Sequence, residues 1–270
     1  MKIIVAIKQV PERDANIRID AEGKWIDLSD VEFNLNESDA YALEEALLLK
    51  EAHGGEVVVI SAGPERVGKT IREALAKGAD RAIHIESADE KELGAYDALG
   101  VAKLLAAAIK EDGGEDGEPD LILTGLQSDD LGLGQTGVIL AELLGLPHAS
   151  LILKIEKTDE GLKVLRELED GWFQHLELPT PAVLTIQSGN TKLRYATLMG
   201  IKRAKTKEVR RFTIADLAVS QPDLKPAEPV VVLEQVVLPH KQRSTQLLGG
   251  SPAEAAAALV EKLQFEVRAL

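Results

Sequence analysis

Cysteine is absent from this chain of 270 residues. Its absence excludes disulfide bonds, thiolate catalysis, zinc sites built on cysteine and cysteine-ligated iron–sulfur clusters. Aromatic residues are also scarce, at 3%, so a core must be built mainly from Ala, Val, Leu and Ile. We expect Trp25 and Trp172 to pack against other residues rather than to stack on a cofactor.

Long apolar runs are missing as well. None approaches the roughly 18 residues that span a bilayer, and the N-terminal run is too short for a signal peptide. Basic residues are outnumbered, with 31 Lys and Arg against 45 Asp and Glu, and the net charge of −14 argues against a nucleic-acid binder. The histidines lack metal-ligand spacing, and no G-x-S-x-G nucleophile motif is present. We expect a cytoplasmic protein, for a prokaryotic source, with no metal site and no catalytic residue of its own.

Short β-branched runs alternate with helical patterns in the first half of the chain. Buried strands are expected over residues 2–10, 56–61, 81–85, 121–124 and 182–186, and helices over 36–53, 65–77, 94–110 and up to Leu144, with an acidic loop over 112–118. Strand–helix alternation predicts right-handed crossovers and a parallel sheet, as in Rossmann-like α/β domains. Ligands of such sheets bind beyond the carboxyl ends of the strands.

The pattern changes after Pro147. Three short runs, over residues 151–157, 162–168 and 172–178, predict an antiparallel hairpin or meander. Residues 190–250 show few periodic stretches and are interpreted as an extended arm that gains its order from a partner surface. Ser251, Pro252 and Glu254 form a strong helix start, and the helix should run to about Phe265. We therefore divide the chain into a nucleotide-binding domain (1–190) and an arm (191–270).

Residues Gly63–Thr70 match the P-loop pattern G-x-x-x-x-G-K-T and stand between a predicted strand and a helix. A P-loop points successive backbone N–H groups at phosphate oxygens. Pro64 has no N–H group, and Glu65 places a carboxylate where phosphate charge would lie. The segment is better interpreted as a strand-to-helix turn with an acid in the first helical turn.

The loop Gly125–Gly137 has the composition of a phosphate site. Three glycines allow a close approach of the backbone to a ligand, and the start of the next helix offers free N–H groups to a phosphate. Asp129 and Asp130 are suited either to ribose hydroxyls or to capping the helix. From these residues alone, a nucleotide site and a flexible surface loop are equally supported.

Basic residues concentrate between Lys192 and Arg211. Eight basic side chains and one acid, Glu208, give this stretch a net charge of +7, which leaves −21 on the rest of the chain. It is either a solvated edge or a surface that docks on an acidic protein, where charge accelerates encounter. The surrounding negative charge disfavours nucleic acid.

Segments over nearly the whole chain resemble the β (small) subunits of electron transfer flavoproteins. The matching segments are VAIKQVP, LNESDAYALEEALLLKE, VISAGPE, IREALAKGADRAIHIE, the loop Gly125–Asp130 with Gln135–Gly137, RELEDG followed by LPTPAVLTIQ, and NTKLRYATLMGIKRAK. The run from RELEDG to PAVLT is close to the signature of that family.

The resemblance implies a parallel-sheet α/β domain of the adenine-nucleotide α-hydrolase-like type, with an arm that reaches onto an α subunit. It also implies one redox-active FAD in the heterodimer, held chiefly by the α subunit, and a redox-inactive AMP bound by the β subunit. The positions matching AMP contacts are Ala6, Asn36, Glu37, Ser38, Asp39, Ala62, Gly125, Leu126, Gln127, Ser128, Asp129, Asp130, Gly132, Gly134, Gln135 and Thr136.

Further roles are implied by the same resemblance. Arg194, Tyr195, Leu198 and Lys202 lie in a segment that resembles the recognition loop, in which a leucine fills a pocket on the partner dehydrogenase. Glu167 matches an acid that positions the mobile FAD domain. The implied electron donors are acyl-CoA or related flavin dehydrogenases, and the acceptor is an electron transfer flavoprotein–quinone oxidoreductase.

Two other functions stay open from the sequence. One is a stand-alone ATPase or stress-type nucleotide-binding protein that uses Gly63–Thr70. The other is a β subunit of the electron-bifurcating type, which holds a second FAD beside a loop reading D-G-D-T-A-Q. Asp130–Gln135 lacks the second carboxylate and the threonine of that loop, which favours AMP.

Overall fold

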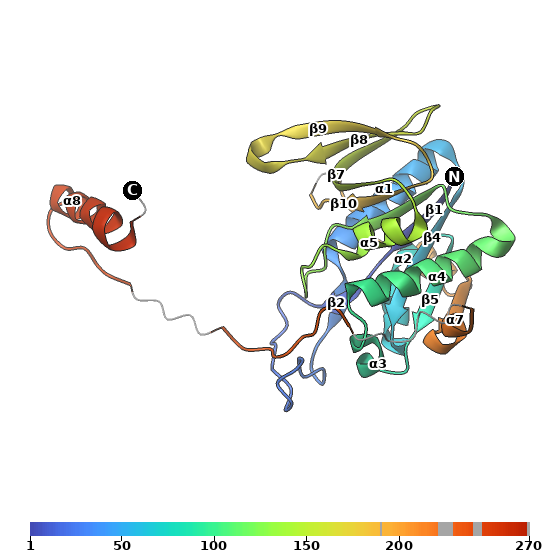
Figure 1. Cartoon of the computed structure of the whole chain (residues 1–270), viewed down its shortest axis with the longest axis horizontal. Helices are drawn as coiled ribbons and strands as arrows, with labels where there is room; N and C mark the ends of the chain where they lie inside the picture. The colour runs from blue at the N-terminus through green and yellow to red at the C-terminus, as the bar shows by residue number, and fades with distance from the viewer. Residues whose placement is uncertain (190, 221–228, 240–244, 269–270) are drawn as a thin grey trace.

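A nine-stranded sheet forms the centre of the molecule in the computed structural model, which describes residues 1–189, 191–220, 229–239 and 245–268 (Figure 1). The strand order is β11-β5-β4-β1-β6-β10-β7-β8-β9. The strands are β1 (Lys2–Ala6), β4 (Glu56–Gly63), β5 (Arg81–Glu86), β6 (Leu121–Gly125), β7 (His148–Lys157), β8 (Leu162–Glu167), β9 (Phe173–Leu178), β10 (Ala182–Ile186) and β11 (Val209–Thr213). All neighbours from β11 to β7 pair in parallel, and β8 and β9 add an antiparallel hairpin. The predicted α/β class is confirmed.

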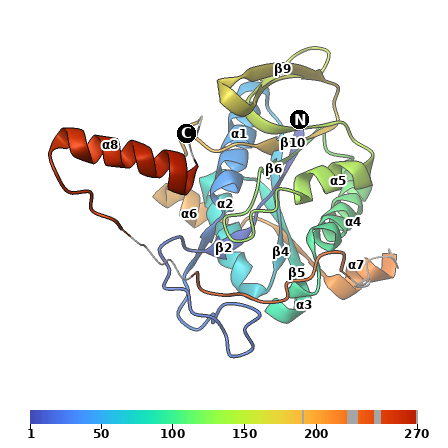
Figure 2. The ribbon, with the colours of Figure 1, turned by 60° about the vertical axis from the view of Figure 1, so that its left-hand side comes forward.

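Helices cover both faces of this sheet, as Figure 2 shows. On one face lie α1 (Glu37–His53), α2 (Gly68–Lys77) and α6 (Leu198–Ala204); on the other lie α4 (Ala98–Asp116), α5 (Thr136–Leu144) and α7 (Ile214–Ser220). The central strands are apolar on both sides because both sides are covered, and Ile3, Ile4 and Val5 have no exposed surface. Among the helices within the described ranges, none combines the length and the apolar character that a bilayer crossing requires.

The order of the strands places a topological switch point beside β1. The chain runs from β1 through β4 to β5 on one side, and then returns to place β6 on the other side of β1. The connections that leave β1 and β6 therefore diverge to opposite sides of the sheet. A crevice opens at the carboxyl ends of such strands, and this is where open α/β sheets bind ligands.

The first predicted strand is shorter than expected. The chain leaves the large sheet after Ala6, because the N–H group of Lys8 donates to the Asp39 carboxylate instead of to a neighbouring strand. Residues Gln9–Pro11 then form β2, which pairs with β3 (Phe33–Leu35) in a separate small sheet. A continuous apolar run thus covers two strands of different sheets.

The boundaries of the third predicted helix, over residues 94–110, are wrong at both ends. A short helix, α3 (Glu90–Gly94), precedes it, and α4 begins at Ala98, where the Asp97 side chain accepts a hydrogen bond from Gly100 N. The helix continues to Asp116, through most of the expected acidic loop. Asp112 is buried against a guanidinium and stabilises helical structure that local sequence does not favour.

The prediction of an extended arm over residues 190–250 is wrong for residues 198–220. This region forms α6, the edge strand β11 and α7. Strand β11 pairs with β5, and Ile214 and Leu217 of α7 join the core beneath α4. Residues 229–239 are extended as expected. The expectations for residues 190, 221–228 and 240–244 of the arm lie outside the described residues.

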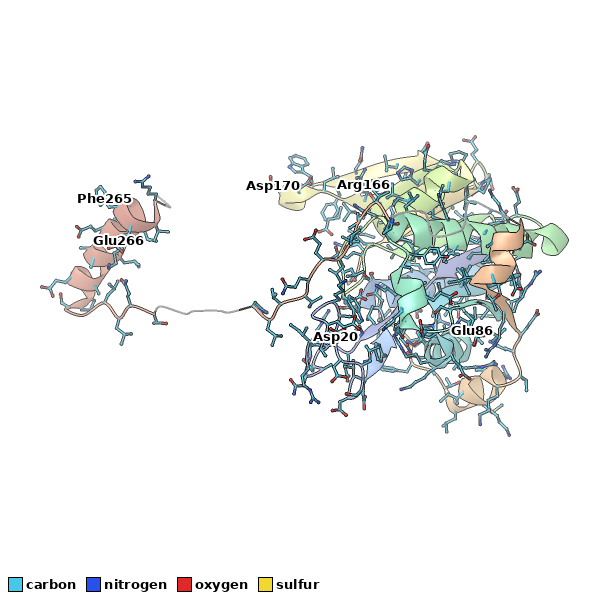
Figure 3. All side chains as sticks on the ribbon, turned by 60° about the horizontal axis from the view of Figure 1, so that its bottom comes forward. Asp20, Glu86, Arg166, Asp170, Phe265 and Glu266 are labelled. Atoms are coloured by element: carbon cyan, nitrogen blue, oxygen red, sulfur yellow. The ribbon has the colours of Figure 1, made fainter. Side chains whose placement is uncertain are left out.

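The C-terminal helix is confirmed. Helix α8 (Pro252–Lys262) starts with a capping box between Ser251 and Glu254 and continues as a wide turn over Leu263–Val267. It lies apart from the sheet (Figure 1), and Figure 3 shows Phe265 and Glu266 near its end. The expectation that Trp172 packs is wrong, because its side chain at the hairpin turn is 72% exposed.

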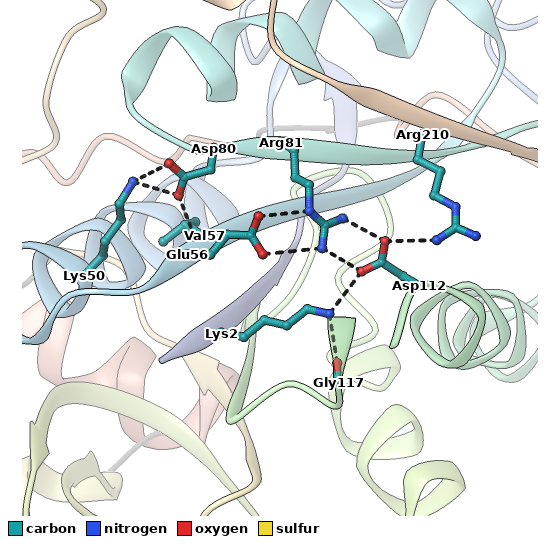
Figure 4. Close-up of polar contacts among 9 residues, drawn as sticks. All are labelled: Lys2, Lys50, Glu56, Val57, Asp80, Arg81, Asp112, Gly117 and Arg210. Atoms are coloured by element: carbon teal, nitrogen blue, oxygen red, sulfur yellow. Dashed lines mark hydrogen bonds and ion pairs between the residues drawn. The ribbon is translucent and has the colours of Figure 1, made fainter. Parts of the chain in front are cut away.

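A buried ion cluster lies at the amino ends of the central strands (Figure 4). The Arg81 guanidinium binds both oxygens of Asp112, at 2.7 and 2.9 Å, and also contacts Glu56 at 2.9 Å. Lys2 and Arg210 approach the same Asp112 carboxylate to 3.3 and 3.5 Å. Burial opposes the ionisation of Asp112, yet the Arg81 charge keeps the pKa of Asp112 below its usual value.

We predict that Asp112→Asn lowers the free energy of unfolding by about 3 kcal/mol, because it removes the more deeply buried of the two carboxylates that contact the Arg81 guanidinium. Urea denaturation measures this loss. The control is Arg211→Gln, which removes an ion pair to Glu86 from a half-exposed side chain and should cost less than about 1 kcal/mol. Equal losses in the two variants would contradict the prediction.

Candidate functional site

The loop after β6 is bound to the start of α1 by side-chain hydrogen bonds. The carbonyl of Gln127 accepts from Asn36 Nδ2 at 2.9 Å and from Ser38 Oγ at 2.6 Å. In return, the N–H group of Asp129 donates to Asn36 Oδ1 at 2.9 Å. Asn36 and Ser38 are almost fully buried. These contacts bring together, at the carboxyl edge of the sheet, two segments that the sequence placed in one site.

The Asp39 carboxylate joins three segments at the switch point. One oxygen accepts the N–H of Lys8 at 2.7 Å, and the other accepts the N–H of Gly125 at 2.9 Å. A Cβ atom on residue 125 would overlap the side chains of Ser38 and Asp39, so only glycine fits there. Burial raises the pKa of Asp39 to about 7, although both backbone donors favour the ionised form. Both oxygens accept hydrogen bonds from the protein backbone, so Asp39 holds the segments of the site together rather than offering its carboxylate to a ligand.

Lys8 is a site residue that the sequence analysis missed. Its ammonium lies 2.7 Å from Asp130 Oδ1 and 3.4 Å from Ser128 Oγ, and it thereby ties the Gly-rich loop to the end of β1. Burial works against ionisation of Asp130, but the Lys8 charge keeps the pKa of Asp130 lowered. The available signal was the position of Lys8, two residues beyond Ala6 at the end of the first strand.

The N-terminus of α5 is open to an anion. Its N-cap residue, Gln135, makes no side-chain bond to the helix, and the first turn carries no acidic residue. Neither Asp129 nor Asp130 caps it, since Asp129 lies beside the N–H of Glu37 in α1 and Asp130 binds Lys8. Gly132 and Gly134 adopt positive φ angles of 64° and 63°, which turn the chain into this helix. First-turn N–H groups without a cap bind phosphate well.

A cavity of about 570 Å³ adjoins this helix start. Its walls come from the first turns of α4 and α5 and from the extended segment that follows α7. Gly134 and Gln135 line it, as do Val230 and Val231, whose N–H groups donate to Asp97. Ala6 and Ala62 lie at the carboxyl ends of β1 and β4 and are not among the residues that line this cavity. The volume is within the range of small-molecule sites.

In the P-loop-like segment Gly63–Thr70, the Gly63 carbonyl and the Thr70 hydroxyl already form hydrogen bonds within the chain. The carbonyl of Gly63 lies 2.9 Å from His84 Nε2 and accepts the N–H of Ser87. Thr70 is 2% exposed, and its hydroxyl accepts from Gln9 at 2.8 Å. A buried, already bonded threonine is unsuited to hold a magnesium ion, which agrees with the interpretation of this segment as a turn.

The segment resembling a recognition loop forms an exposed surface that includes α6. Tyr195 and Leu198 are 90% and 88% exposed, and Met199 and Ile201 extend the apolar surface along α6. Lys192, Lys202, Arg203 and Lys205 form no ion pair within the described part of the chain. Arg194 differs, because Glu44 and Glu51 bind its guanidinium.

Glu167 lies at the end of β8, where its carboxylate accepts from Gln187 at 3.3 Å. Gln187 directly follows β10, so Glu167 is near the same carboxyl edge as the Gly-rich loop. Over the ranges that the structure describes, no group of three or more His, Asp or Glu side chains is arranged to hold a metal ion.

The fold defines an α/β protein whose candidate ligand site lies at a topological switch point. A family model of the electron transfer flavoprotein domain matches residues 24–217. The electron transfer flavoprotein β subunit of Methylophilus methylotrophus is 38% identical over 265 residues, 97% of each chain. Those of Bacillus subtilis and of Arabidopsis thaliana, the latter mitochondrial, are each 34% identical over at least 98% of each chain.

The chain therefore belongs to the electron transfer flavoprotein family and corresponds to its β subunits. This confirms the resemblance seen in the sequence. Membership makes the chain an electron-transfer subunit of a flavoprotein and implies an α subunit as partner.

We predict that the Asp39 carboxyl makes stability fall as the pH rises. Its pKa of about 7 in the folded chain exceeds the ordinary value of 3.8. The unfolded chain therefore releases this proton first, and the free energy of unfolding decreases between about pH 4 and pH 7. Asp39→Asn has no such proton. In urea titrations, the unfolding free energy of wild type minus that of the variant should decrease from pH 4.5 to pH 8; a constant or rising difference would refute the assignment.

Proposed function

We propose that this chain, with its α subunit, forms an FAD-containing heterodimer that carries electrons from flavin dehydrogenases, those of acyl-CoA among them, to a quinone oxidoreductase. FAD, when bound between the subunits, supplies the redox chemistry. This chain supplies a structural AMP site, a surface for the α subunit and a docking segment. The observation that carries the proposal is family membership over the full length of the chain.

The AMP site is proposed at the switch point. The uncapped start of α5 at Gln135 and Thr136 offers N–H donors to the phosphate. Gly134 leaves the backbone accessible, since a Cβ there would meet nothing nearer than 3.5 Å. The start of α1 and the ends of β1 and β4 enclose the rest of the nucleotide, on the positions from Asn36 to Asp39, Ala6 and Ala62. The donor set therefore fits a monophosphate nucleotide held without acid–base chemistry.

The α subunit is proposed to cover the C-terminal arm and α8. Helix α8 lies apart from the sheet (Figure 1), and its Leu259, Val260 and Phe265 are 49%, 46% and 74% exposed. Segment 230–238 likewise exposes several valines and leucines. Large apolar side chains exposed in such numbers along two segments indicate a protein partner. Glu167, at the carboxyl edge, is proposed to position the FAD domain of that partner.

The dehydrogenase is proposed to dock on α6 and the turn before it. Leu198 and Tyr195 project from a surface that carries the unpaired cations Lys202 and Lys205. An exposed apolar anchor within a positive rim combines a fast, charge-steered encounter with a buried contact that gives specificity.

Nucleotide extraction tests the ligand site. We expect protein purified with its α subunit and denatured by heat to release AMP at about one per β chain and FAD at about one per heterodimer. A β chain purified alone should still release AMP. Flavin released from the β chain alone would support the bifurcating type instead, and no nucleotide in any preparation would refute the site. ATP hydrolysis abolished by Lys69→Ala would favour the ATPase alternative.

Leu198→Ala tests the docking segment. We expect kcat/KM for reduction of the heterodimer by a purified acyl-CoA dehydrogenase to fall about tenfold, because a truncated interface anchor costs on the order of 1–2 kcal/mol. AMP content and melting temperature should not change, because Leu198 is 88% exposed. Unchanged reduction kinetics would remove the docking assignment.

A further inference from the structure

Arg194 is held within the chain by two carboxylates of α1. Its Nε and Nη2 atoms donate to Glu44 at 2.8–3.0 Å, and its backbone N–H donates to the same carboxylate at 3.1 Å. Its Nη1 atom donates to Glu51 at 2.6 Å. Glu44 is 5% exposed. The charge of the guanidinium is thus compensated within the chain. To contact a partner protein instead, the Arg194 side chain would have to give up as many as five hydrogen bonds.

The bonds to Glu51 and Glu44 raise the pKa of Arg194 above its ordinary value, and the bond to Arg194 lowers the pKa of Glu51. Both directions mean that the charged pair is favoured in the folded chain. Bidentate contacts between a guanidinium and a carboxylate also fix the orientation of the arginine side chain, because the planar donors and acceptors must face each other. Residue 194 is therefore fixed relative to α1, directly before Tyr195 and four positions before Leu198.

Residues on either side of Arg194 are also held against the neighbouring helices α1 and α2. Thr191 donates to Glu45 of α1. A Cβ atom on Gly200 would overlap the carbonyl of Ala76, so α6 rests directly on the end of α2. Arg72 of α2 donates to the Ala204 carbonyl at 2.6 Å. The exposed side chains of Tyr195 and Leu198 thus stand on a backbone that is fixed at both ends.

We propose that Arg194 is a positioning residue for electron-transfer docking, and that its guanidinium holds Tyr195 and Leu198 in place from α1 instead of contacting the dehydrogenase. This inference rests on the proposed docking function of the segment. The positive charge that the dehydrogenase meets comes from the side chains without an ion pair, such as Lys202 on α6. The resemblance alone had placed Arg194 among the contact residues.

Glu51→Gln separates positioning from direct contact by the sign of its effect. If Arg194 positions the segment, loss of one carboxylate loosens it, and the KM of the heterodimer as electron acceptor rises about fivefold because fewer molecules hold the docking conformation. If Arg194 contacts an acidic partner, removing the competing Glu51 charge lowers KM. We expect the rise, with kcat unchanged, from steady-state reduction by a purified acyl-CoA dehydrogenase. A KM that falls or does not change overturns the proposal.

Arg194→Gln and Lys202→Gln form a matched pair, since each removes one positive charge from the segment. Arg194→Gln should raise KM about fivefold or more. Lys202→Gln should flatten the dependence of kcat/KM on ionic strength. The double variant Arg194→Gln with Glu51→Gln removes one charge of each sign, so it should keep the wild-type dependence on ionic strength, and its KM should be no higher than that of Arg194→Gln alone. Flattening by the double variant, or additive effects on KM, would show direct contact.

Leu198→Ala distinguishes failure of the proposed docking function from failure of the proposed role of Arg194. If Leu198→Ala has no effect, the docking function itself fails. If Leu198→Ala impairs reduction while Glu51→Gln does not, only the role of Arg194 fails. Melting temperature and AMP content accompany each variant, and Glu51→Gln provides a folded test if Arg194→Gln is unstable, because Glu51 is on the exposed side of the pair.

Discussion

The carboxylate of Asp39 is the contact on which the ligand edge depends. It accepts N–H groups from Lys8 and Gly125, which are 31 and 86 residues away in sequence, and so joins the ends of two strands to the start of a helix. The connections that follow the two strands diverge there because the order of the sheet reverses, and Lys8 and Gly125 then have backbone N–H groups that donate to Asp39 instead of to a neighbouring strand. A buried carboxylate satisfies both donors at once. The desolvation that raises its pKa is the cost of that arrangement.

Helix α1 serves both sites of the molecule. Its first turn, from Asn36 to Asp39, fixes the Gly-rich loop, while Glu44 and Glu51 further along bind Arg194. One helix therefore holds both the Gly-rich loop at the sheet edge and the segment that carries the exposed Leu198. In the proposed function, this arrangement separates the nucleotide site from the surface where a dehydrogenase would approach.

The cations between Lys192 and Arg211 divide into two groups that the sequence does not distinguish. Arg194, Lys207, Arg210 and Arg211 bind carboxylates or carbonyls of the chain and hold α6 and β11 in place. Lys192, Lys202, Arg203 and Lys205 remain free in the described structure and carry the positive charge of the surface. The net charge of this stretch is +7 in the sequence, but only about half of that charge is available to a partner on the surface.

Sequence alone determined the parallel α/β architecture, the hairpin and the capped C-terminal helix, because each follows from a local pattern of apolar residues, turns and caps. It also placed the Gly-rich loop at the carboxyl edge of the sheet, since the carboxyl ends of parallel strands meet at one edge. Only the tertiary structure decided where β1 ends, that α4 continues through an acidic stretch, that β11 joins the sheet and that Arg194 faces inward. In each case a partner distant in sequence, such as Asp39, Arg81 or Glu44, supplies the charge or hydrogen bond that local propensity lacks.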